Sequence, residues 1–112
     1  MLMSVDAHRL AEERSIAYHR AIAERLRTNP EVLELALARV RAWLGGPGEP
    51  PHFARAWQEI LRRNREELCS FLTDDGEAAR ELRRSSPFAG VLTPTERWEI
   101  WRRVATELER EP

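Results

Sequence analysis

Two histidines near the start of the chain are the first residues whose spacing could support chemistry. His8, Glu12, Ser15 and His19 recur at intervals of four, three and four, so one continuous helix would place them on one face. Two imidazoles and a carboxylate are ligands that zinc accepts. However, the helical rise would separate His8 from His19 by roughly 16 Å, which one ion cannot bridge. A Ser15–His19 pair has no third group in this pattern to orient the histidine as a base. The pattern therefore predicts neither a metal site nor a catalytic site.

The remaining reactive residue types also lack the partners that chemistry needs. Cys69 is the single cysteine and lies in a short apolar segment, where a free thiol is usually buried and inert. Most carboxylates have an arginine three or four residues away, as in Glu59 and Arg63, which is typical of a solvated helix face. The segment GGPG (45–48) is too rich in proline for a phosphate-binding loop, and no lysine follows it. We therefore expect a protein that is not an enzyme and that carries no cofactor.

Composition limits the remaining classes of function. A chain of 112 residues, 42% apolar and 33% charged, is typical of one soluble globular domain. The formal net charge of −1 argues against an overall electrostatic attraction to nucleic acid. No apolar run is long enough to span a bilayer, and residues 1–4 do not resemble a secretory signal. Together with the lone cysteine, these features predict a cytoplasmic protein with no membrane segment.

Capping residues divide the chain into helices. Asn29 and Pro30 begin one helix, which the loop GGPGEPP (45–51) ends. Asn64 and Asp75 are further candidate caps, and the strongest signal is TPTE (93–96), with Thr93 as cap and a glutamate three residues later. No segment shows the alternation of a strand. We predict an all-α fold: a single small domain of five to six short helices in an irregular helical bundle.

The first helix is harder to delimit from the sequence. Ile16, His19, Ile22 and Leu26 form an apolar stripe, and Ser15 could cap its start. Residues 1–14 are compatible with a helix but do not continue this stripe. The prediction is therefore an N-terminal helical extension over residues 1–14 and a single helical domain over residues 15–112.

The densest basic cluster is RRNR (62–65), between two short apolar helices. This arrangement could form a helix-turn-helix in which Arg65 opens the recognition helix. Glu66 and Glu67 follow at once and would face the phosphates. The alternative hypothesis that this cluster supports is a small DNA-binding transcriptional regulator that uses Arg62, Arg63 and Arg65.

The stretch SSPFAGVLTPTERWEIW (85–101) poses the main functional question. An uncharged connector, PFAGVL (87–92), is followed by a helix with two tryptophans. These apolar residues could close the core, or they could form a surface for a partner, since tryptophan and arginine dominate binding hot spots. In the second case the candidate partner-binding residues are Phe88, Arg97, Trp98, Trp101 and Arg102.

Two stretches carry a resemblance to a known class of proteins: RSIAYHRAIAERLRTNPEVLELALARVRAWL (14–44) and LRRSSPFAGVLTPTERWEIWRR (82–103). They resemble small all-helical bacterial proteins that are similar to the antitoxin half of toxin–antitoxin pairs. The resemblance implies a cytoplasmic protein that binds and neutralises a toxin encoded beside it by masking a surface, and it transfers no catalytic residue. The chain lacks the clear DNA-binding module of many antitoxins. Our main hypothesis is a non-enzymatic interaction module with one protein partner, a toxin, and self-association into a homo-oligomer stays open.

Overall fold

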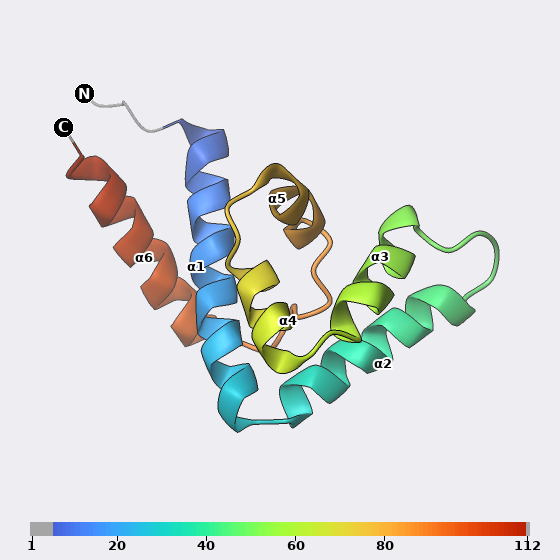
Figure 1. Ribbon diagram of the computed structural model, residues 1–112. Coiled ribbons are helices and arrows are strands. Elements are labelled where there is room, and N and C mark those ends of the chain that lie inside the picture. The colour runs from blue at the N-terminus through green and yellow to red at the C-terminus, as the bar shows by residue number, and fades with distance from the viewer. Residues whose placement is uncertain (1–5, 112) are drawn as a thin grey trace.

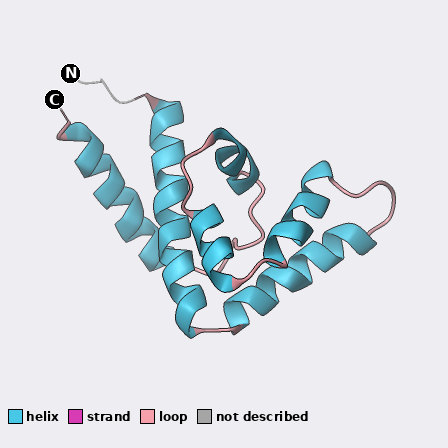
Figure 2. Cartoon of the chain, viewed as in Figure 1, coloured by secondary structure: helices cyan, strands magenta, loops and turns pink. Residues whose placement is uncertain are grey.

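A computed structural model describes residues 6–111 of the chain. Within this range it contains helices and loops but no strand (Figure 2), which confirms the predicted all-α class. The six helices are α1 (Ala7–Thr28), α2 (Glu31–Gly45), α3 (His52–Leu61), α4 (Arg65–Leu72), α5 (Glu77–Arg83) and α6 (Pro94–Glu109). None of these helices combines the length and apolar composition that crossing a bilayer requires.

Helix α1 is the centre of the bundle. Figure 1 shows α6 on one side of α1, running in the opposite direction, and α4 and α5 on the other side. Helices α2 and α3 form an antiparallel hairpin that extends away from α1. The two described ends of the chain lie at the same end of the molecule, where Arg9 and Glu111 form an ion pair of 2.7 Å.

Local hydrogen bonds explain where several helices begin. The carboxylate of Asp6 accepts a hydrogen bond of 3.1 Å from the amide of His8 and caps α1. Asn64 caps α4 by accepting from the amide of Glu67 at 2.9 Å, as predicted. Ahead of α2, the Asn29 side chain accepts from the amide of Glu31 at 3.0 Å.

Two expected helix starts are wrong. Helix α1 begins at Ala7 instead of Ser15, because Asp6 supplies a cap about two and a half turns upstream. Residues 7–14 therefore belong to α1. In this part of α1, the carboxylate of Glu12 lies 3.6 Å from the guanidinium groups of Arg80 and Arg84, in and just after α5. Residues 1–5 of the predicted extension lie outside the described residues. Asp75 does not cap α5 either; the helix begins after Gly76, whose amide donates to the side chain of Asp74 at 3.1 Å.

The core is built around one tryptophan. Trp57 of α3 is fully buried, and its indole N–H donates to the carbonyl of Leu82 at 3.2 Å. Its ring meets the rings of Phe71 and Phe88 edge to face, with centroids 5.8 and 6.3 Å apart. Three segments that are distant in the sequence therefore converge on Trp57. From α1, Ile22 and Leu26 complete the same core.

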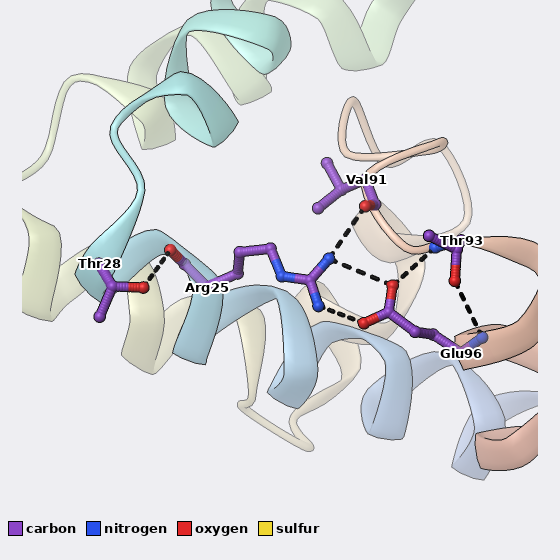
Figure 3. A network of polar contacts seen from close by, with 5 residues as sticks. All are labelled: Arg25, Thr28, Val91, Thr93 and Glu96. Atoms are coloured by element: carbon purple, nitrogen blue, oxygen red, sulfur yellow. Dashed lines mark hydrogen bonds and ion pairs between the residues drawn. The ribbon is translucent and has the colours of Figure 1, made fainter.

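A polar network attaches the start of α6 to α1 (Figure 3). Both terminal nitrogens of the Arg25 guanidinium donate hydrogen bonds to the carboxylate of Glu96. The guanidinium also donates to the carbonyl of Val91 at 3.2 Å. The same carboxylate accepts from the amide of Thr93 at 2.8 Å, and the Thr93 hydroxyl accepts from the amide of Glu96 at 3.1 Å, which is the predicted capping box. The hydrogen bonds from Arg25 and from the Thr93 amide lower the pKa of Glu96 to about 2.

Candidate functional site

The uncharged connector before α6 belongs to the core. Phe88 is only 1% exposed, because it fills the space beside Trp57, and Pro87 and Leu92 are buried with it. The proposal that Phe88 lies on a partner-binding surface is therefore wrong. The connector closes the bundle through Phe88, so Phe88 is not part of the candidate partner-binding surface.

In contrast to Phe88, the two tryptophans of α6 are exposed to solvent. Trp98 is 54% exposed and Trp101 is 39% exposed. The side of α6 that faces α1 carries Ile100, Val104 and Leu108, which repeat every four residues and are all buried. Each residue advances about 100° around a helix, so Trp98 lies well outside this buried stripe and Trp101 lies at its edge.

The exposed tryptophans form an ordered stack. Their ring centroids lie 5.0 Å apart with an angle of 14° between the planes. The guanidinium carbon of Arg14, on α1, lies 3.7 Å from the centroid of Trp101, and that of Arg102 lies 6.0 Å from Trp98. Arg97 lies 5.9 Å from the ring of Tyr18 in the same way. These six residues are called the aromatic–arginine surface: Arg14, Tyr18, Arg97, Trp98, Trp101 and Arg102.

The aromatic–arginine surface carries positive charge that the described part of the chain does not neutralise. Within residues 6–111, neither Arg14 nor Arg97 nor Arg102 has a carboxylate within 4.0 Å, whereas Arg25 and Arg27 do. A shallow depression of about 230 Å³ lies among Pro94, Arg97 and the tryptophans. The surface thus combines exposed aromatic area, free guanidinium groups and a recess for a side chain, which suits an acidic and partly apolar partner.

Sequence reasoning found four of these six residues and missed Arg14 and Tyr18. Both lie on α1, more than seventy positions before α6. Their spacing of four residues places them on one face of a helix, which is a usable signal. Nothing in the sequence, however, indicates that this face of α1 lies beside the tryptophans of α6.

The basic cluster of the DNA-binding alternative lies elsewhere. Arg62 and Arg63 follow the end of α3, Arg65 begins α4, and all three are exposed. The first turn of α4 also exposes Glu66 and Glu67. A recognition helix would therefore present two carboxylates beside its arginines, and the geometry adds no observation in favour of this alternative.

His19 lies inside the bundle and is held by two hydrogen bonds. Its Nδ1 is 2.7 Å from the carbonyl of Ser15, and its Nε2 is 2.8 Å from the hydroxyl of Ser86. A carbonyl oxygen can only accept, so Nδ1 carries the proton of the neutral ring and Nε2 accepts from the Ser86 hydroxyl. Burial lowers the pKa of His19 to about 4, and the charge of Arg83 acts in the same direction.

The contact between Ser86 and His19 resembles a nucleophile and its base, but the ring is a poor proton acceptor. A pKa of about 4 leaves the imidazole neutral and weakly basic. The Ser86 hydroxyl also accepts from the amide of Phe88 at 3.2 Å, which shapes the turn that brings Phe88 into the core. The arrangement satisfies a buried histidine and shapes the connector. The sequence indicated Ser15 as the nearby serine, but that residue contributes its carbonyl.

The other residue types with reactive side chains are also accounted for. The thiol of Cys69 is buried, lies 3.6 Å from the carbonyl of Ala23, and has a raised pKa because of that burial. Between residues 6 and 111, no three side chains of histidine, cysteine, aspartate or glutamate are grouped so that they could hold a metal ion.

Comparison of the chain with protein-family models, with curated proteins and with solved structures gave no match. The feature of the described residues that points to a function is the aromatic–arginine surface, through the chemistry that it can support.

Proposed function

We propose that the protein is a non-enzymatic interaction module that binds one protein partner through the aromatic–arginine surface. The observation that carries this proposal is the stacked pair of Trp98 and Trp101, 54% and 39% exposed and flanked by arginines that have no ion-pair partner among residues 6–111. The core is closed by other residues of α6, so the two tryptophans are available for an intermolecular contact.

The expected energetics agree with a binding role. A tryptophan side chain offers a large area for burial, and about 25 cal/mol is gained per Å² of apolar surface removed from water. Two half-exposed rings could together supply several kcal/mol on binding, before the costs of association. The stack and the cation–π contact with Arg14 hold the rings in place, so little side-chain entropy is lost when a partner binds.

The partner's chemistry follows from the charges on the surface. Arg14, Arg97 and Arg102 favour a segment that carries aspartate or glutamate, and the recess beside Trp98 favours an apolar side chain next to it. The resemblance to antitoxin-like proteins makes a toxin encoded beside this protein the first partner to test. In that case the protein neutralises the toxin by covering its functional surface.

The test is a pull-down of the tagged protein from nuclease-treated native lysate, with mass spectrometry of the proteins recovered. We expect one stoichiometric partner that is lost with Trp98→Ala. The matched control is Leu35→Ala, since Leu35 is a comparably exposed apolar residue on α2. Recovery of the bait alone, or of a partner that both variants retain equally, would contradict the proposal. If the partner is the neighbouring gene product, its toxicity on expression should be suppressed by the wild type and not by Trp98→Ala.

A further inference from the structure

A second recess lies beside His19, between α1 and the connector that leads to α6. Its volume is about 270 Å³. A cavity of about 150 Å³ accommodates benzene, so this one has room for a small ring or branched chain together with a polar head group. Its apolar lining comes from Ile22, Phe88 and Leu92, all of which are buried core residues.

The charged residues that line this recess all carry positive charge. Arg83, Arg84 and Arg97 all line it, and no aspartate or glutamate does. Arg84 is partly neutralised, because Glu12 and Glu81 lie 3.6 and 3.2 Å from its guanidinium.

Arg83 is the most informative of the three arginines. It is only 5% exposed, and within the described residues it has no carboxylate within 4.0 Å. Its Nη1 donates to the carbonyls of Leu72 and Asp74 at 3.3 and 2.6 Å, and its Nε has no hydrogen-bond partner. The carboxylates of Glu12, Asp74 and Asp75 act on the charge of Arg83 from a distance, but none forms an ion pair with it, so a bound anion would supply a direct partner.

The neutral polar groups of the recess complete a binding site. Tyr18, His19 and Ser86 line it together with the arginines. The hydroxyl of Ser86 and Nε2 of His19 are joined by a hydrogen bond of 2.8 Å, which holds both side chains in place. The lining thus combines apolar residues, neutral polar residues and arginines, as small-molecule sites do.

We propose that this recess binds a small organic anion, in which a carboxylate or phosphate group is attached to a compact apolar body. The anionic group would lie among Arg83, Arg84 and Arg97, since guanidinium groups match the geometry of both oxyanions. The apolar body would pack beside Tyr18 and Ala89, two of the more accessible apolar residues of the lining. The recess shares Tyr18 and Arg97 with the aromatic–arginine surface but does not include Trp98 or Trp101, and its argument does not depend on the proposed function.

The proposal is tested with three probes of similar shape: benzoate, phenyl phosphate and the neutral benzamide. Each is titrated into the full-length, isotope-labelled protein at low salt, and amide and imidazole shifts are followed by NMR. We expect saturable shifts at Ser86, Gly90 and the His19 ring with at least one anion. We also expect that anion to bind at least tenfold more tightly than benzamide. Equal binding of benzamide and the anions, or no saturable shift with any probe, would overturn the proposal.

Variants then locate the site. Arg97→Gln and Arg84→Gln remove exposed charges at the recess and should weaken anion binding several-fold. Arg103→Gln makes the same change in net charge on an exposed residue of α6 that does not line the recess, and it should bind like the wild type. An equal effect of Arg103→Gln, or no effect of either recess variant, would show that the anion binds elsewhere. Circular dichroism of each variant verifies that the fold is retained.

Discussion

Acid should destabilise this protein through His19, whose pKa is much lower in the folded protein than in the unfolded chain. The ordinary pKa of 6.5 falls to about 4 in the folded protein, because the ring is buried and faces Arg83. The hydrogen bond to the Ser15 carbonyl opposes this change without reversing it. Between these two pKa values the unfolded chain binds a proton that the folded protein does not.

The sign and size of the effect follow from this difference. The contribution of neutral His19 is complete above pH 6.5 and is lost progressively as the pH falls toward about 4. Each pH unit in this window lowers the free energy of unfolding by roughly 1.4 kcal/mol, so the full loss is about 3 kcal/mol. A domain of this size is typically stable by about 5–15 kcal/mol, so the loss should be easy to measure.

The assay is urea unfolding followed by far-UV circular dichroism at several pH values between about 7.5 and 4.5. We expect the wild type to lose stability steadily below pH 6.5, whereas His19→Gln should be less stable at neutral pH and nearly flat over this range. The matched control is His52→Gln, since His52 is exposed, and it should keep the slope of the wild type.

A direct titration of the His19 ring by NMR checks the cause. The ring should remain neutral down to about pH 5 in the folded protein. A midpoint near 6.5 for the folded state would refute the reasoning, and so would parallel stability profiles for wild type and His19→Gln. Either result would mean that protonated His19 is tolerated in the bundle.

Three further predictions concern the connector and α6. Phe88→Ala leaves a cavity beside Trp57 and should lower the free energy of unfolding, measured by urea denaturation, by about 3–5 kcal/mol. A loss below about 1 kcal/mol would contradict the place of Phe88 in the core. Gly90→Ala should cost about 1 kcal/mol by the same measurement because Gly90 has a φ of 92°, and an unchanged stability would show that this backbone relaxes. Acrylamide should quench a large part of the tryptophan emission, and Trp98→Phe should reduce the quenchable fraction; a fully protected emission would show that Trp98 is covered in solution.

The cap at Thr93 and the core position of Phe88 illustrate two kinds of sequence information. The Thr93 capping box joins residues three positions apart, so its donor and acceptors can be read directly from the chain. The cap at Asn64 and the loop after α2 could be predicted from the sequence for the same reason. The start of α1 was misplaced because Asp6 and Ser15 are both plausible caps, and the choice depends on whether residues 7–14 pack against the α5 region.

Apolar type alone could not separate Phe88 from Trp98. Both are aromatic residues beside arginines and prolines, and both fitted either a core or a surface. Phe88 became core because the turn at Ser86 directs it toward Trp57, while Trp98 stayed exposed because the rotation of α6 presents Ile100 to α1 instead. The orientation of one helix on another depends on side chains from both, which no single segment specifies.

By itself, the sequence determined the helical class, most of the helix boundaries and a set of candidate residues, because helical periodicity and capping are short-range effects. The tertiary structure decided which of those candidates are exposed. It brought Arg14 to Trp101 and Ser86 to His19, across most of the length of the chain. Such contacts arise when helices pack together, so the aromatic–arginine surface and the recess beside His19 exist only in the folded bundle.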